Sequence, residues 1–132
     1  MNLVTIIIPF YRKREFFYKT INSILNQSFQ RFKIIIIYDD ENKRDLRFLK
    51  SFKNKKIQII INKKNLGVGK SRNKGIKITK TKYIAFCDAD DIWSKHKLKE
   101  QIFFMEKMNA EFSHTDYTII NNKDKIIGKM NI

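Results

Sequence analysis

Unbroken apolar runs alternate along this chain with stretches in which apolar residues recur every three or four positions. A short apolar run indicates a strand buried on both faces, and the second pattern indicates an amphipathic helix. The predicted strands cover residues 3–8, 32–38, 57–61, 83–87 and 111–120, and the predicted helices cover 14–26, 45–52, 68–78 and 94–108. Pro9 should end the first strand because it has no N–H to donate. Ser94 should cap the last long helix.

Strands and helices alternate four times, which predicts parallel strands joined by right-handed crossovers. The expected fold class is therefore α/β, with a mostly parallel central sheet. Ligands of such sheets bind outside the carboxyl ends of the strands. Residues 9–11, 39–40 and 88–91 each follow a predicted strand, so they should converge on one edge. An aromatic ring and two acidic pairs there would suit a nucleotide.

Three carboxylates, Asp88, Asp90 and Asp91, crowd into four residues at the end of the fourth predicted strand. Such carboxylates repel one another unless a cation or hydrogen-bond donors offset them. If the chain stays extended, Asp88 and Asp90 point to the same side with Cα atoms roughly 6.5–7 Å apart, and they could share one hard cation. The alternative is an acidic loop leading into a helix, capped by Asp91 or Ser94.

Composition limits the chain to one domain of 132 residues, with 42% apolar residues and a formal charge of +15. A basic surface can bind nucleic acid, anionic lipid or phosphorylated ligands. The lysines are spread along the whole chain, however, and A/T-rich codons alone could produce the bias, so no specific nucleic-acid partner is expected. A single cysteine excludes an internal disulfide, and no apolar run has the length of a membrane span. We expect a cytoplasmic protein.

The glycine-rich segment 67–71 looks like the end of a phosphate-binding P-loop but fails its spacing, because Lys64 stands where the first glycine belongs. The dinucleotide fingerprint fails as well, since Arg72 occupies its third glycine position. What remains is a loop containing Asn65, followed by a helix that carries cations in its first turns. Such a helix N-terminus suits a diphosphate. The alternative is a flexible turn that lets the helix pack close to the sheet.

Five segments recur in a familiar order: VTIIIPFY, SILNQSF, IIIIYDD, NLGVGKSRNKGI, and YIAFCDADDIW followed by KLKEQ. Together they resemble the nucleotide-binding half of the family 2 glycosyltransferases, and the match runs from about Leu3 to Met108. The resemblance implies a GT-A fold, a Rossmann-like three-layer α/β/α sandwich. It also implies transfer of a sugar, with inversion, from a nucleotide diphosphate donor, most often a UDP-sugar, to a glycan or lipid-linked acceptor.

The resemblance assigns roles to individual residues. Pro9 and Tyr11 would border the base, Asp39 and Asp40 would hold the base and ribose, and Arg72 would lie by the nucleotide. The D-x-D carboxylates Asp88 and Asp90 would meet the ribose and a Mg²⁺ or Mn²⁺ ion that offsets charge on the departing diphosphate. The nucleotide-sugar-binding residues expected are therefore Pro9, Tyr11, Asp39, Asp40, Asn65, Arg72 and Asp88, with Asp88 and Asp90 as metal ligands.

Two departures from the family pattern change these expectations. A bulky, charged loop follows Asp40 where the family usually has a small turn. The family's catalytic base lies well beyond the D-x-D, and the acids after Met108 (Glu111, Asp116 and Asp124) lie in no matching context. We therefore expect a domain of residues 1–132 truncated on its acceptor side, with no identifiable catalytic residue. The alternative function is a nucleotide-sugar-binding module without transfer activity.

Three further expectations concern partners and location. A chain without an acceptor half would leave the sheet edge near 111–127 uncovered, which favours self-association or completion by another chain. A nucleic-acid-binding protein is the third hypothesis, suggested only by the charge. By analogy with the family, the protein would work in polysaccharide biosynthesis, at the cytoplasmic face of the membrane, where a basic surface suits anionic lipid.

Overall fold

The computed structural model describes residues 1–131 and divides after His96 into two compact units. Ile132, the last residue of the expected domain, lies outside the described residues. The elements of the first unit are β1 (Val4–Phe10), α1 (Arg14–Leu25), β2 (Phe32–Tyr38), the 3₁₀ turn η1 (Lys43–Asp45), α2 (Leu46–Ser51), β3 (Ile57–Ile61), α3 (Val68–Ile78) and β4 (Tyr83–Phe86). Those of the second unit are α4 (Lys97–Met108), β5 (Tyr117–Ile120) and β6 (Ile126–Met130). The predicted bounds of β2, β3 and α3 are confirmed without change.

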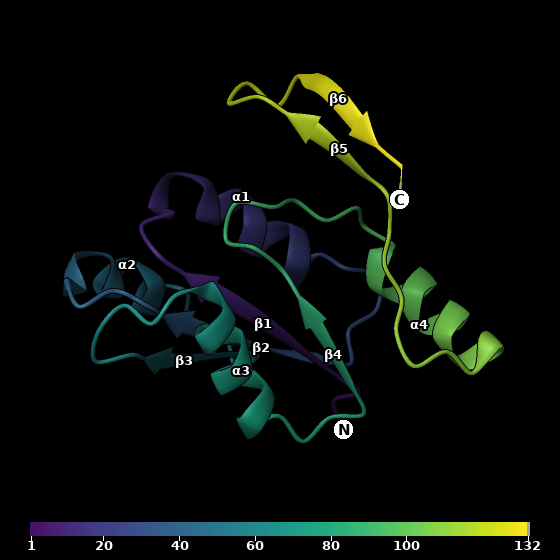
Figure 1. Ribbon diagram of the computed structural model, residues 1–132, viewed down its shortest axis with the longest axis horizontal. Helices are drawn as coiled ribbons and strands as arrows, with labels where there is room; N and C mark the ends of the chain where they lie inside the picture. The colour runs from purple at the N-terminus through teal and green to yellow at the C-terminus, as the bar shows by residue number, and fades with distance from the viewer. Residues whose placement is uncertain (132) are drawn as a thin grey trace. The chain divides into compact units, whose positions relative to one another are not determined.

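The first unit is built on a parallel four-stranded sheet in the order β3-β2-β1-β4, which confirms the expected α/β class. The chain moves from β1 to β3 in one direction and then returns past β1 to form β4. Right-handed crossovers therefore place α1 and α2 on one face of the sheet and α3 on the other (Figure 1). The direction reverses between β1 and β4, which is where ligands bind in sheets of this kind.

The core lies between the helices and the two central strands, β1 and β2. Every residue of β2 except Lys33 is buried, and so is every residue of β1 except Pro9, as their apolar runs predicted. Phe10 belongs to this core: its ring stacks on Tyr38 and meets Phe17 edge-on, with centroids 5.9 and 5.1 Å away. The predicted strand 3–8 therefore extends by two residues, to Phe10.

Pro9 does not end β1, contrary to the prediction, but lies within it opposite Ile37. The pairing of β1 with β4 stops at Ile7, opposite Phe86, two residues before the proline. At Pro9 the strand therefore has a neighbour on one side only, and proline is tolerated at such edge positions.

β4 differs from the strand that its apolar run predicted. It is an edge strand paired only with β1, and Ile84 and Phe86 are 37% and 46% exposed. An apolar run shows that a strand contacts other apolar groups, but not how many of its sides are covered. The prediction that both faces of this strand are buried was wrong.

Helix α3 lies unusually close to the sheet at Gly75. A Cβ atom at this position would lie 2.6 Å from Cγ2 of Ile7 and 2.9 Å from its Cδ1. Ile7 is fully buried and packs with Ile35 and Ile37 in the core of the sheet. The absence of a side chain at residue 75 therefore sets the distance between helix and sheet.

The predicted start of the last long helix is corrected by hydrogen bonds near the end of the first unit. Helix α4 begins at Lys97 and not at Ser94. The carbonyl of Ser94 accepts a hydrogen bond from Nε2 of Gln27 (2.7 Å), and the carbonyl of Lys95 accepts one from the N–H of Ser28 (2.9 Å). These bonds tie residues 94–95 to the loop that follows α1, so the chain is not yet helical there.

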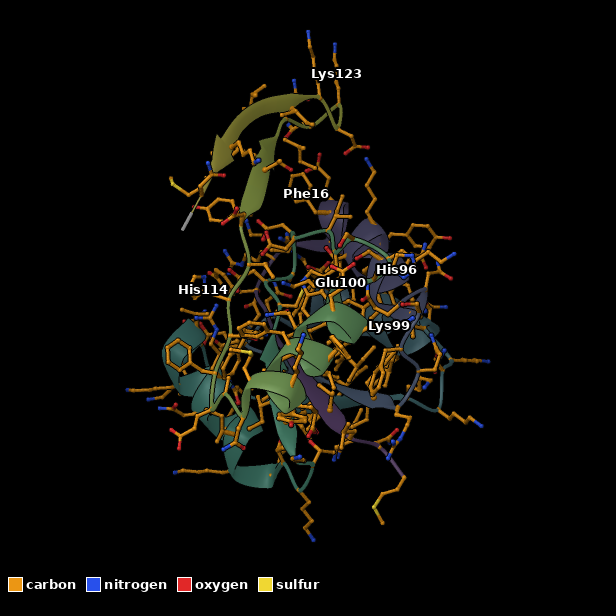
Figure 2. All side chains as sticks on the ribbon, turned by 90° about the vertical axis from the view of Figure 1, so that its right-hand side faces the viewer. Phe16, His96, Lys99, Glu100, His114 and Lys123 are labelled. Atoms are coloured by element: carbon orange, nitrogen blue, oxygen red, sulfur yellow. The ribbon has the colours of Figure 1, made fainter. Side chains whose placement is uncertain are left out.

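The second unit consists of α4 and an antiparallel hairpin formed by β5 and β6. The fifth predicted strand, 111–120, is shorter than expected. Ser113 and Thr115 instead accept hydrogen bonds from Gln101 (3.0 Å) and Lys97 (2.7 Å) of α4. Lys123 lies at the tip of the hairpin, its side chain pointing outward (Figure 2). Among the described residues there is no helix with the length and apolar character needed to cross a membrane.

Candidate functional site

A hollow of about 460 Å³ opens where the carboxyl ends of the first unit's strands meet. It collects residues from four separate parts of the chain, as the alternation of strands and helices predicted. The lining residues are Pro9, Tyr11, Lys13, Asp39, Asn65, Gly67, Val68, Asp88, Ala89 and Asp90. Six of the eight predicted site residues thus line one hollow, and Arg72 joins them through its contact with Asp88.

The acids Asp88 and Asp90 reach this hollow through a turn, not through an extended chain. The N–H of Asp91 donates to the carbonyl of Asp88 (3.1 Å), so residues 88–91 bend back at once after β4. The condition on which the sequence placed the two carboxylates side by side is therefore not met. Both carboxylates line the hollow nevertheless.

Each of these two carboxylates is paired with a cation from another element. An Oδ1 atom of Asp88 lies 2.6 Å from Nη2 of Arg72 on α3, and Oδ2 of Asp90 lies 2.7 Å from Nζ of Lys13. The hydrogen bond to Asp90 raises the pKa of Lys13 above its usual value. The sequence did not predict Lys13 as a site residue, although the two basic residues that follow Tyr11 were a usable signal.

The donor set of this turn suits a hard divalent ion. No cluster of three or more His, Cys, Asp or Glu side chains that could hold a metal occurs among the described residues. Mg²⁺, however, is commonly held by only one or two carboxylates, with the remaining oxygens supplied by substrate phosphates and water. Asp88 and Asp90, with side chains 51% and 37% exposed, can provide this pair of ligands.

The carboxylate of Asp39 accepts hydrogen bonds from other residues of the chain. Its Oδ1 atom accepts hydrogen bonds from Nδ2 of Asn62 (2.7 Å) and from the N–H of Leu66 (2.8 Å), and its Oδ2 accepts one from the N–H of Gly67 (2.9 Å). The side chain of Asn65 donates to the carbonyl of Asp39 (3.0 Å). The aspartate thereby ties the end of β2 to the loop before α3. Direct contact between its carboxylate and a nucleotide stays a prediction.

Asp40 is buried beside the hollow and lies in an ion pair. Its Oδ2 atom accepts from Nε of Arg12 (2.9 Å), and its Oδ1 accepts from the N–H of Asn42 (3.0 Å). The hydrogen bond from Arg12 lowers the pKa of Asp40 below its usual value. The hydroxyl of Tyr38 donates to the carbonyl of Asn42 (2.6 Å), which also orders this loop. The charged loop that departs from the family pattern is therefore well anchored.

Arg12 also lies over the ring of Tyr11, with its guanidinium carbon 4.8 Å from the ring centroid. Its backbone adopts a φ of 51°, a left-handed conformation that few residues other than glycine adopt. Such strain persists where surrounding contacts enforce it. Arg12 therefore connects Tyr11 with Asp40, two of the residues that the family resemblance assigns to the base.

We expect Arg12→Ala to reduce stability in a pH-dependent manner. Because the pKa of Asp40 is lowered in the folded state, its ion pair stabilises the protein above pH ~4 and loses this effect as the pH falls through the folded-state value. Urea unfolding should therefore separate variant from wild type at pH 7 and bring them together once the pH has fallen below the lowered pKa of Asp40. Arg14→Ala, which removes a guanidinium lying over Phe48, is the control. A difference between Arg12→Ala and wild type that persists at low pH would contradict the assignment.

A second hollow, of about 570 Å³, lies beside Arg12 and contains three arginines. Its lining residues are Arg12, Arg14, Glu15, Arg44, Asp45 and Phe48. Arg12 is paired with Asp40, Arg44 lies 3.9 Å from Asp45, and Arg14 lies over Phe48. None of the predicted site residues lines this second hollow, whereas six of them line the first, so we place the site at the first hollow.

Comparison with known proteins identifies the family of this chain. The sequence profile described as Glycosyl transferase family 2 matches residues 5–131. An Escherichia coli protein named UDP-Glc:alpha-D-GlcNAc-diphosphoundecaprenol beta-1,3-glucosyltransferase WfgD is 35% identical over 96% of this chain, which spans 50% of that protein. An uncharacterized glycosyltransferase of Rickettsia bellii is 41% identical over 97% of the chain, which spans 19% of it.

The fold comparison points the same way. The structure of S. aureus TarS 1-349 in complex with UDP-GlcNAc superimposes with a TM-score of 0.74 at 25% identity, over 83% of this chain and 32% of that one. The chain thus spans half or less of the relatives named here. The profile match covers nearly its whole length, and the chain therefore belongs to glycosyl transferase family 2.

Proposed function

We propose that this chain forms the donor-binding part of a glycosyltransferase that transfers a sugar from a nucleoside diphosphate to a glycan or lipid-linked acceptor. UDP is the nucleotide that we propose. The observation that carries the proposal is the convergence of Tyr11, Asn65, Gly67, Asp88 and Asp90 on one hollow at the switch point of the sheet. The UDP-GlcNAc complex of TarS and the UDP-glucose named for WfgD support the choice of nucleotide.

Each part of the hollow suits a different part of the ligand. Tyr11 is 43% exposed and offers a ring for the base. Lys13 and Arg72 are cations that could turn from their carboxylates to the diphosphate. The Nε atom of Arg72 is buried without a hydrogen-bond partner among the described residues, so the protein satisfies this guanidinium only in part.

Asp88 and Asp90 would hold a Mg²⁺ or Mn²⁺ ion. A bound divalent ion would offset the negative charge that develops on the diphosphate as the sugar leaves. Asp88 and Asp90 would then face the ion instead of Arg72 and Lys13. Both cations would become available for phosphate oxygens. Inversion at the sugar and dependence on metal are the behaviour implied by the family resemblance and form part of the proposal.

The second candidate is a module that binds a nucleotide sugar without transferring it. Among the described residues that line the hollow, the acids are Asp39, Asp88 and Asp90, and each contacts a donor or cation of the protein. None of these three carboxylates is therefore free to act as the base that deprotonates an acceptor hydroxyl. Release of sugar from UDP-glucose or UDP-GlcNAc by the purified chain would argue against this candidate.

Calorimetric titration of UDP into the purified chain tests the proposal. We expect binding in Mn²⁺ that weakens at least about tenfold when EDTA removes the metal, because Asp88 and Asp90 would hold the ion and its charge would offset that of the diphosphate. GDP and CDP should be titrated in parallel to identify the preferred base. Failure of all three nucleotides to bind in Mn²⁺ would overturn the proposed function. Binding that EDTA does not alter would remove the metal from it.

A further inference from the structure

A buried polar cluster lies directly behind the hollow. It joins the ends of β2 and β3 to the first turns of α3 through Asp39, Asn62 and Ser71, which are at most 2% exposed. Buried polar groups of this kind stabilise a fold only when each has a partner. Asn62 is the centre of the cluster, and neither its sequence position nor the family resemblance assigns it a role.

The amide of Asn62 is held in one orientation. Its Nδ2 donates to Oδ1 of Asp39 (2.7 Å) and to Oγ of Ser71 (3.1 Å), while its Oδ1 accepts from Nζ of Lys74 (2.7 Å). An ammonium can only donate and a carboxylate can only accept. A flipped amide would set its NH₂ against the Lys74 ammonium and its oxygen against the Asp39 carboxylate.

The fixed amide in turn fixes the direction of the Asp39 carboxylate. With Asn62 on one side, the two oxygens face the backbone N–H groups of Leu66 and Gly67, at 2.8 and 2.9 Å. Gly67 has a φ of 85°, so the chain turns sharply at this point to begin α3. Asn65 and Gly67, on either side of Leu66, line the hollow.

We propose that Asn62 is a positioning residue of the nucleotide site. It acts through Asp39, whose carboxylate it aims at the loop N–H groups, and thereby holds the loop 65–68 in the shape that the ligand meets. The inference rests on the proposed function for its ligand. The contact chain itself, from Lys74 through Asn62 and Asp39 to the loop, is independent of which nucleotide binds.

Two substitutions at this position separate aiming from packing. Asn62→Ala removes the amide, whereas Asn62→Asp keeps its shape but sets a second carboxylate against Asp39. If Asn62 only fills space, the isosteric aspartate should be the milder change. If it aims Asp39, aspartate should be the more harmful change because like charges repel. Gln58→Glu adds the same charge at an exposed position of β3 and is the matched control.

The first measurement is hydrogen exchange of the Leu66 and Gly67 amides in the chain without nucleotide. Both amides should exchange at least about tenfold faster in Asn62→Ala and faster still in Asn62→Asp, with the amides of β2 unchanged. The second measurement is the Kd for UDP in Mn²⁺, which should rise about tenfold in Asn62→Ala and further in Asn62→Asp. Gln58→Glu should match wild type in both.

The exchanged pair, Asp39→Asn with Asn62→Asp, completes the test. It restores an amide–carboxylate hydrogen bond but leaves one amide oxygen for two loop N–H groups. At least one of the two amides should therefore stay unprotected, and UDP should still bind more weakly than to wild type. Full recovery in the exchanged pair, or a milder effect of aspartate than of alanine at position 62, would overturn the inference. A wild-type chain that binds no nucleotide would overturn the proposed function alone, because the exchange measurement would still report on the loop.

Discussion

Asp90→Asn should abolish the metal dependence of UDP binding and weaken binding in Mn²⁺ by at least about 100-fold, since loss of even an indirect partner of a metal ligand costs 10–100-fold. The substitution keeps the size of the side chain but removes one of the two carboxylates of the turn after β4 that line the hollow. It also removes the partner of Lys13, whose pKa should fall back toward its ordinary value. The measurement is calorimetric titration of UDP in Mn²⁺ and in EDTA.

Asp91→Asn is the matched control for this experiment. Asp91 is the next acid along the chain and does not belong to the lining of the hollow, so its replacement changes the charge of the same turn by the same amount. We expect it to retain metal-dependent binding. If Asp90→Asn binds UDP as wild type does, with the same response to EDTA, then Asp90 is not a metal ligand.

Gly75→Val should destabilise the protein by about 3 kcal/mol or more, a large part of the total stability of a domain of this size. The Cβ atom of the new valine would lie 2.6, 2.9 and 3.0 Å from three side-chain atoms of Ile7. Ile7 is fully buried, so its branched side chain cannot move out of the way. Helix α3 would have to move away from the sheet. Urea unfolding, followed by circular dichroism, measures the effect.

Two further variants identify the cause of this loss. Gly69→Ala lies on the same helix with no atom within 4 Å of its Cβ, so it should be neutral or stabilising by up to about 1 kcal/mol. Ile7→Ala should cost less in the Gly75→Val background than in wild type, because it removes the atoms that clash. Equal costs in both backgrounds would mean that the contact with Ile7 does not set the position of α3.

The sequence predicted the helices, strands and topology of this protein better than the contacts between its side chains. The apolar runs of β2 and β3, each interrupted by one polar residue, and the helical spacing of α3 gave the observed bounds, because propensity and packing favour the same structure there. The convergence of three strand ends followed from topology alone. The covering of β4 could not be predicted in this way, since it depends on which strands become neighbours.

The sequence predicted which residues form the site, but not which hydrogen bonds and ion pairs join them. The acids could be recognised because they directly follow apolar runs, and all eight predicted residues lie within the segments that carry the family resemblance. Which partner each carboxylate faces depends on side-chain directions across elements that are distant in sequence. Asp39 toward its loop, Asp40 toward Arg12 and Asp90 toward Lys13 could be found only from the folded arrangement.

The order of strands also has a consequence for how the chain acquires its structure. Val4 pairs with Phe32 on one side and with Tyr83 on the other, so the contact between β1 and β4 closes a far longer segment than that between β1 and β2. Contacts between residues far apart in the sequence form late, because closing a long segment costs conformational entropy before the contacts stabilise it. We expect β1, β2 and β3 to assemble first and β4 to dock last. The turn that carries Asp88 and Asp90 then takes shape only at the end of folding, and a weakened β4 would give a largely folded chain without the hollow that this turn lines.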